Sequence, residues 1–469
     1  MKGRRQNEGE GTIQTLTIDG YDSTGGGVAR LPDGQVVFVK GALAGETCHV
    51  RLDKVGKSAC WGRVAQVLAP SPHRVLPDCP DYPQCGGCQL RHMDYQEELS
   101  MKRRRVEDAV RRIGGLDLSV EAIHGAELPD RYRNKVQYPV APGEKGPRIG
   151  FYRARSHDVI DTEDCLLQPE SASRLRRAVK GWMEEFQVPA YDEKAHEGLI
   201  RHCYVRSNQA GETLCALAVN GGTLPHESEL ASRLRQAEPG LVGVVLSINR
   251  KRTNVILGQE FRTLWGRDYL EDTLCGLRFQ LSVPSFYQVN RDQAEVLYGR
   301  AVAFANLTGR ETVLDLYCGI GTITLAMARM AGRAIGAEVA PQAVEDAREN
   351  ARRNGVKNAE FFCGDAGQVA AMLARRGERP QVVCVDPPRK GLAPEVIDAI
   401  ACMEPKRVVY VSCDPGTLAR DLARFAQKGY TVTRLECVDL FPRTAHVETV
   451  VLLTAGEDGG KRRSGSADI

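Results

Sequence analysis

The stretch Val313-Leu314-Asp315-Leu316-Tyr317-Cys318-Gly319-Ile320-Gly321 decides the fold, because an apolar strand runs directly into a turn that contains two glycines. The residues from Thr324 to Met330 then continue as a helix. Further apolar segments follow at residues 333–337, 359–362, 382–385, 407–411, 430–435 and 448–453, and helical segments separate most of them. This alternation predicts an α/β fold with a doubly wound sheet, whose ligands bind outside the carboxyl ends of the strands.

Acidic residues follow the next two strands. Glu338 ends the second strand, where it can accept both hydrogen bonds from a ribose diol, and Asp365 follows the third, where it can meet an adenine amino group. Gly319 and Gly321 let backbone N–H groups approach a ligand. Threonine at position 324 departs from the dinucleotide fingerprint G-x-G-x-x-G. The combination resembles the S-adenosylmethionine site of class I methyltransferases, and it favours that cofactor over a nicotinamide or a structural turn.

The segment Val409-Tyr410-Val411-Ser412-Cys413-Asp414-Pro415 is an apolar strand that ends on a cysteine. A thiol beside a methyl-donor site suggests addition to C6 of a pyrimidine, which makes C5 nucleophilic, since a thiolate both attacks and leaves well. A helix after Cys413 is expected to lower the thiol pKa. A base must later remove the C5 proton. Glu448, a carboxylate that begins an apolar strand, is the favoured base, and His446 is a weaker candidate.

The segment Asp386-Pro387-Pro388-Arg389-Lys390-Gly391 follows the fourth strand. Asp386 is placed to orient the target base or the cofactor. Arg389 and Lys390 favour a substrate that carries phosphate. Cytosine-5 methyltransferases usually have a cysteine beside the proline of this motif, and the lack of one in this segment disfavours cytosine as the target.

These motifs together resemble the RNA uracil-5-methyltransferase family over nearly the whole chain. The segment Ser285-Phe286-Tyr287-Gln288-Val289-Asn290 matches the F-x-Q-V-N motif of that family. The resemblance implies that Phe286 stacks on the target uracil and that Gln288 contacts the methionine end of the cofactor. It also implies that Cys413 is the nucleophile and that Glu448 is the base. The further residues that it implies contact the cofactor or the substrate are Tyr317, Glu338, Asp365 and Asp386.

The upstream chain indicates the branch of the family. Short strands between Gly11 and Leu68 predict a small closed barrel, which resembles a TRAM domain, an RNA-binding module that the transfer-RNA enzymes are expected to lack. Thiols at Cys79, Cys85 and Cys88, with a distant fourth at Cys165, suit either zinc or a [4Fe-4S] cluster by spacing alone. The resemblance to the 23S ribosomal-RNA branch, including its Gram-positive dual-site members, favours an iron–sulfur cluster with a structural role.

A chain of 469 residues with a net charge of only +3 is too long for one core and requires any RNA surface to be local. Seven basic residues and one acid lie between Arg131 and Arg155, interleaved with Tyr132, Tyr138, Phe151 and Tyr152. This pattern suits single-stranded RNA, and a solvated sheet face is an equal alternative. With no apolar membrane span or secretion signal expected, the cytoplasm is the predicted compartment.

We therefore expect a TRAM barrel at residues 1–70 and a central α+β domain with an Fe-S cluster and an RNA surface at 71–284. A methyltransferase domain at 285–455 and a disordered tail at 456–469 complete the expected organisation. The expected reaction is S-adenosylmethionine-dependent formation of 5-methyluridine in a single-stranded or loop segment of 23S ribosomal RNA. Transfer RNA as the substrate, RNA cytosine-5 methylation, or a degenerate RNA-binding or redox-sensing protein are the alternatives. Nothing in the sequence implies a membrane or a protein partner.

Overall fold

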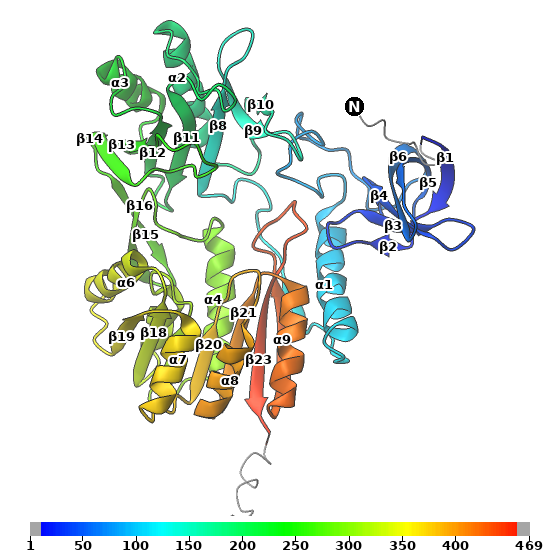
Figure 1. Cartoon of the computed structure of the whole chain (residues 1–469), viewed down its shortest axis with the longest axis vertical. Helices are drawn as coiled ribbons and strands as arrows, with labels where there is room; N and C mark the ends of the chain where they lie inside the picture. Colours follow the sequence, from blue (N-terminus) through cyan, green and yellow to red (C-terminus); the bar gives the residue numbers. More distant parts are fainter. Residues whose placement is uncertain (1–10, 457–469) are drawn as a thin grey trace, which may run out of the picture. The chain divides into compact units, whose positions relative to one another are not determined.

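The computed structural model describes residues 11–456, which fall into two compact units (Figure 1). The first unit runs to Arg105 and includes Phe441–His446; the second comprises Val106–Leu440 and the chain from Val447. The tail predicted to be disordered lies outside the described residues except for Gly456. Within residues 11–456, no helix combines the length and the apolar character that a membrane crossing requires.

The first unit contains a six-stranded, strongly curved sheet in the region where short strands predict a small barrel. Its order is β1-β5-β6-β4-β3-β2. Only Ile18 and Asp19 separate β1 from β2, although these strands lie at opposite ends of that order, so the sheet bends back on itself. The backbone N–H of Ile18 donates to Glu46 O at 2.9 Å and that of Asp19 to Val28 O at 2.7 Å. The strands are β1 (Ile13–Thr17), β2 (Gly20–Tyr21), β3 (Gly27–Arg30), β4 (Val36–Lys40), β5 (Thr47–Val55) and β6 (Ala59–Ala69).

The second unit contains a seven-stranded sheet in the order β10-β9-β8-β11-β12-β13-β14. Helices α2 (Glu170–Glu185) and α3 (Glu227–Ala237) cover one face of it (Figure 1). β12 and β13 pair in parallel, because α3 carries the chain back across the sheet between them. The strands are β8 (Lys135–Ala141), β9 (Arg148–Tyr152), β10 (Val159–Asp161), β11 (Ile200–Ser207), β12 (Thr213–Val219), β13 (Leu241–Ile248) and β14 (Glu260–Gly266).

A hairpin of β15 (Tyr269–Leu274) and β16 (Leu277–Ser282) leads into an eight-stranded sheet in the order β19-β18-β17-β20-β21-β23-β22-β7. Its strands are β7 (Ala122–His124), β17 (Thr312–Leu316), β18 (Arg333–Glu338), β19 (Ala359–Cys363), β20 (Val382–Val385), β21 (Arg407–Ser412), β22 (Tyr430–Val438) and β23 (Glu448–Ala455). Each apolar segment predicted from residue 313 onward is a strand. β7 comes from the region expected to form the central domain, yet it pairs in parallel with β22.

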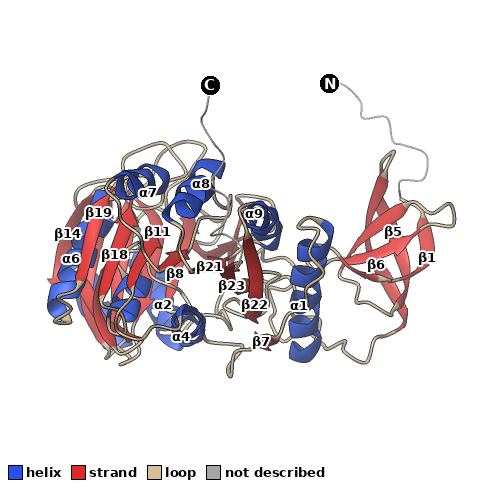
Figure 2. Cartoon of the chain, turned by 90° about the horizontal axis from the view of Figure 1, so that it is seen from below, coloured by secondary structure: helices blue, strands red, loops and turns tan. Residues whose placement is uncertain are grey.

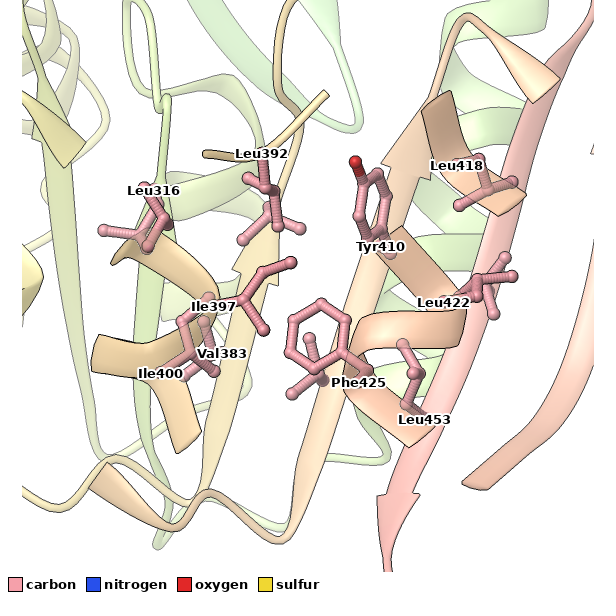
Figure 3. Close-up of a cluster of buried hydrophobic side chains, with 14 of the residues drawn as sticks. Leu316, Val383, Leu392, Ile397, Ile400, Tyr410, Leu418, Leu422, Phe425 and Leu453 are labelled. Atoms are coloured by element: carbon pink, nitrogen blue, oxygen red, sulfur yellow. The ribbon is translucent and has the colours of Figure 1, made fainter. Parts of the chain in front are cut away.

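Helices cover both faces of the eight-stranded sheet, with α7, α8 and α9 on one side and α4 on the other (Figure 2). On the first side, Phe425 and Leu422 of α9 and Ile397 and Ile400 of α8 pack on strand residues such as Val383 (Figure 3). This dry core fixes the strand ends from which the site is built. The helices are α1 (Tyr95–Arg112), α4 (Arg291–Ala305), α5 (Thr322–Ala328), α6 (Pro341–Arg353), α7 (Ala366–Arg375), α8 (Pro394–Met403) and α9 (Pro415–Gln427).

The chain that joins β22 to β23 belongs in part to the first unit. There, the buried ion pair between Lys102 Nζ and Glu98 Oε1 of α1 spans 2.7 Å. Glu98 accepts the backbone N–H of Arg443 at 2.7 Å, and Lys102 donates to Phe441 O at 3.2 Å. The first turns of α1 therefore hold the segment that leads to Glu448.

Candidate active site

A pocket lies at the carboxyl end of β17, where a doubly wound sheet binds its ligand. The segment before α4 contributes one wall, the turn between β17 and α5 contributes another, and Asp386 closes it from the end of β20. Its lining residues are Leu274, Phe286, Tyr287, Gln288, Tyr298, Asp315, Tyr317, Cys318, Gly319, Ile320, Thr322, Ile323 and Asp386.

The turn after β17 adopts a backbone that L side chains rarely adopt. Tyr317 has φ 70°, Gly319 has φ 56° and Gly321, the N-cap of α5, has φ 86°. A bulky aromatic residue in the left-handed region is an outlier, and such residues cluster at ligand sites. A Cβ on Gly321 would also approach Ala347 Cβ and the Phe361 ring at 3.2 Å. The turn is therefore a specialised structure that faces the pocket.

The two acids expected to bind the nucleoside also support the backbone. Glu338 accepts from Gly319 N at 3.1 Å and from Ala340 N at 2.9 Å, which ties the end of β18 to the glycine turn. Asp365 is the N-cap of α7 and accepts from Gly367 N at 3.0 Å. Asp365 Oδ1 also accepts from Gln368 N at 3.3 Å, which leaves Asp365 Oδ2 and one lone pair on each Glu338 oxygen for a ligand.

Asp315, which was not predicted to contact a ligand, has unsatisfied bonding capacity in the pocket. It is fully buried, and its Oδ2 accepts from Thr324 Oγ1 at 2.5 Å, while Oδ1 has no partner among the described residues. Burial raises the pKa of Asp315 to about 7, an effect to which the charge of Asp386 adds. An orphaned buried acceptor is costly unless a ligand completes it. Its place at a strand end before a glycine turn was the available sequence signal.

Cys413 and Glu448 belong to one electrostatic cluster with Asp386 and Arg389. Cys413 follows β21, and Glu448 is the first residue of β23, where it is only 5% exposed. Burial raises the pKa of Glu448 to about 8, the charge of Asp386 adds to this, and Arg389 opposes it. Burial likewise raises the pKa of Asp386 to about 7. The structure thus brings the predicted nucleophile, the predicted base and the acid of the fourth-strand loop into mutual range.

The expected lowering of the Cys413 thiol pKa is wrong. Burial raises it to about 11, the charges of Glu448 and Asp386 add to this, and Arg389 counteracts them. The helix that was to lower the pKa is already capped, because Asp414 accepts from Thr417 N at 2.9 Å. In the protein without its substrates, the thiol is therefore held in its protonated form.

The loop that carries Asp386 and Arg389 is fixed by α9, the helix that follows the thiol. Asp421 is fully buried and its Oδ2 accepts from Leu392 N and from Tyr410 Oη, both at 2.8 Å. Thr417 Oγ1 donates to Arg389 O at 3.1 Å. A Cβ on Gly391, whose φ is 72°, would lie 2.6 Å from Asp421 Oδ2. Helix α9 thus fixes the loop after β20, which carries Asp386 and Arg389, and it also follows directly on the loop that carries Cys413.

Phe286 and Gln288 line the mouth of the pocket from the segment before α4. The Phe286 ring is 68% exposed, which leaves its face available for stacking. The backbone is held from the neighbouring sheet, since Asn134 Nδ2 donates to Gln288 O at 2.9 Å and Arg206 donates to Ser285 O at 2.6 Å.

The predicted cluster ligands do not form a metal site in this structure. Cys79, Cys85 and Cys88 are close enough to influence one another's ionisation, and burial, the largest cause, raises the pKa of Cys88 to about 11. Across residues 11–456, however, no three His, Cys, Asp or Glu side chains converge to hold a metal ion. Cys165 lies in the second unit. The thiols have the right chemistry, but their arrangement does not form a cage, and we derive no step through a cluster.

The interleaved aromatic residues between Arg131 and Arg155 are only partly available to RNA. Tyr138 is 1% exposed and belongs to the core beneath α2, and Phe151 packs against that core. The pattern that suits single-stranded RNA therefore leaves these two rings unavailable for stacking, because both pack into the core that α2 covers.

Comparison with known proteins defines the class. The profile described as tRNA (Uracil-5-)-methyltransferase matches residues 248–456, and a TRAM domain matches residues 8–59. An uncharacterized RNA methyltransferase of Clostridium tetani is 42% identical over 94% of this chain and 95% of that protein. Another from Halalkalibacterium halodurans is 44% identical over 95% and 96%. The chain is an RNA methyltransferase of the class I, S-adenosylmethionine-dependent fold. It belongs to the RNA uracil-5-methyltransferase family with a TRAM domain.

A solved structure also resembles the chain over nearly its whole length. Pyrococcus abyssi tRNA (uracil-54, C5)-methyltransferase in complex with S-adenosyl-L-homocysteine aligns with a TM-score of 0.75 and 25% identity. The alignment covers 94% of this chain and all of that one, more than could be covered without the N-terminal barrel. The expectation that transfer-RNA enzymes of the family lack this barrel is therefore wrong, and the barrel does not identify the substrate.

Proposed function

We propose that this protein methylates C5 of a specific uridine in 23S ribosomal RNA, forming 5-methyluridine. The observation that carries the proposal is the gathering of Cys413, Glu448, Asp386 and Arg389 next to a pocket of the S-adenosylmethionine type. An amine or hydroxyl acceptor would need no thiol, whereas a pyrimidine carbon does. We place the reaction in the cytoplasm.

In the proposed mechanism, the Cys413 thiol first releases its proton to solvent, and the resulting thiolate forms a bond to C6 of the uracil. The electron pair of the C5–C6 double bond is then delocalised over C5 and O4. Gln288, Tyr317, Glu338 and Asp365 would hold S-adenosylmethionine, whose methyl group would pass to C5 as its bond to the sulfonium sulfur breaks, leaving S-adenosylhomocysteine. The Glu448 carboxylate then takes the C5 proton, the double bond reforms, and the Cys413 thiolate leaves with its electron pair. Phe286 stacks on the base, and Arg389 binds a phosphate of the RNA backbone next to that nucleotide.

Transfer RNA is the second candidate substrate, favoured by the full-length likeness to a tRNA (uracil-54, C5)-methyltransferase. Purified protein should be incubated with labelled S-adenosylmethionine and either a 23S ribosomal-RNA transcript or bulk transfer RNA, both lacking modification. We expect label in the ribosomal transcript, at C5 of a uridine mapped by mass spectrometry. Label confined to transfer RNA would show that transfer RNA is the substrate. Label on cytidine would refute uridine as the methylated base.

We further propose that Cys79, Cys85, Cys88 and Cys165 provide the thiolates for a [4Fe-4S] cluster of structural function, whose assembly would have to bring together side chains that do not converge among residues 11–456 of this structure. Four thiolates suit iron–sulfur as well as zinc, and the likeness to the ribosomal-RNA branch favours iron. Protein prepared without oxygen should show brown absorbance and about four irons per chain, and Cys85→Ser should lose both. Cys402→Ser, at an exposed thiol outside the set, is the matched control. A colourless preparation that contains zinc would refute the iron assignment.

A further inference from the structure

Two cations face each other across neighbouring strands close to the pocket mouth. Lys135 of β8 lies directly opposite Arg206 of β11 in the antiparallel register, and the two strands are adjacent in Figure 1. Like charges directly opposite each other destabilise a sheet. The presence of two opposed cations beside the segment that carries Phe286 and Gln288 therefore requires an explanation.

The Arg206 side chain has hydrogen-bond partners within the described part of the protein, whereas the Lys135 side chain has none. The Arg206 guanidinium is buried and donates to Ser282 O at 3.0 Å and to Ser285 O at 2.6 Å. The side chain of Lys135, which is partly buried, has no hydrogen-bond or ion-pair partner among residues 11–456. Burial lowers the pKa of Lys135 to about 8, and the charges of Arg206 and Arg133 add to this. A partly buried ammonium among cations is the environment that an anion would stabilise.

Arg133 provides a second unsatisfied donor at the same place. Its Nε is buried and has no hydrogen-bond partner in the described part of the chain. Its backbone forms a bridge with Asn290, and the neighbouring Asn134 holds Gln288 O and Val289 O. The two donor groups are thus attached to the same backbone that positions Phe286.

We propose that Lys135 and Arg133 form a phosphate-binding site for the RNA backbone next to the target nucleotide. This inference rests on the proposed function and adds to Arg389 a second contact with the RNA backbone. An extruded base leaves the phosphates on either side of it to be held by the protein, and cations provide such contacts without reading sequence. Arg389, in the loop after β20, would provide a separate phosphate contact next to Cys413 and Glu448.

The carboxylate of the methionine moiety is the competing anion, because Asn134, which lies between the two cations in the chain, donates to Gln288 O at the pocket. Binding of RNA phosphate and binding of the cofactor carboxylate would affect different measured quantities. A contact to RNA phosphate releases counterions and gives a salt-dependent affinity, with a slope of about −0.7 per contact for single strands. A contact to the cofactor would instead change the KM of S-adenosylmethionine.

The test compares Lys135→Met with wild type in the full-length protein. We expect the KM for the RNA substrate to rise about tenfold, with kcat within about twofold and the KM of S-adenosylmethionine unchanged. The logarithmic salt slope of RNA binding, measured by fluorescence anisotropy, should become shallower by about 0.7. Lys135→Arg should retain the slope. Lys180→Met is the control, since this lysine is already paired with Asp161.

A neutral methylphosphonate placed at successive positions around the methylated uridine locates the contact. At one position, the methylphosphonate should weaken RNA binding by the wild-type protein but not by Lys135→Met. An unchanged salt slope, a raised KM for S-adenosylmethionine, or a lower melting temperature with no change in RNA binding would each overturn the inference. If wild-type protein methylates no RNA at all, the proposed function fails instead, and the anisotropy measurement still reports on the phosphate site.

Discussion

The protonated state of Cys413 predicts that this thiol reacts slowly until substrates bind. Its pKa of about 11 leaves about one thiol in ten thousand ionised at pH 7. An ordinary thiol of pKa about 8.5 is about 3% ionised at that pH. The higher pKa also makes the thiolate intrinsically more nucleophilic by a factor of about ten, so the net slowing is roughly twentyfold to thirtyfold.

The assay is alkylation by iodoacetamide, followed by mass spectrometry of the peptide that contains Cys413. A free cysteine peptide provides the reference rate, and a series from pH 7 to pH 11 provides the pKa. Glu448→Gln removes a negative charge that raises the pKa, so this variant should titrate at lower pH and react faster above pH 8. Arg389→Met removes a charge that lowers the pKa and should shift the titration to higher pH.

Asp398→Asn, which removes a surface carboxylate paired with Lys428, is the matched control and should leave the titration unchanged. If Cys413 in the free protein reacts as fast as the peptide, its thiol is not held protonated by its surroundings. If Glu448→Gln and Arg389→Met shift the titration in the same direction, the charges do not act on the thiol as the structure places them.

Three further predictions concern the base, the loop and the core. Because burial raises the pKa of Glu448 to about 8 and only its ionised form accepts a proton, single-turnover product release should quicken roughly tenfold between pH 7 and pH 9; a flat profile would exclude it as the base. Tyr410→Phe removes a hydrogen bond to buried Asp421 and should cost about 1–3 kcal/mol of unfolding free energy in urea; an unchanged value would show that Asp421 does not depend on that hydroxyl. Phe425→Ala, in the core beneath α9 (Figure 3), should cost about 3–5 kcal/mol and leave the Cys413 titration intact in the folded fraction; a cost below about 1 kcal/mol would contradict the packing.

The sequence predicted the strands of the second unit best where they are apolar on both faces. β17, β20 and β21 are buried throughout or nearly so, and such strands form continuous apolar runs. β7 was missed because its three residues are only partly buried. Its partner β22 lies about 300 residues further along the chain, and no local pattern reports such a pairing.

The candidate site residues could be identified individually, but their influence on one another could not. The motif around Cys413 pointed to a thiol at a strand end, and a following helix suggested a low pKa. The opposite result arises because Asp386, from β20, and Glu448, from β23, approach the thiol only in the folded sheet. Asp414 looked like part of the catalytic motif, yet its carboxylate is used as the cap of α9.

Capture of the covalent intermediate is the decisive measurement for the proposed role of Cys413. RNA that carries 5-fluorouridine at the methylated position cannot lose a C5 proton after methyl transfer, so it should remain bonded to the protein when S-adenosylmethionine is present. We expect a cross-linked peptide that contains Cys413, and no cross-link with Cys413→Ala. A cross-link to another cysteine, or normal turnover by Cys413→Ala, would show that this thiol is not the nucleophile.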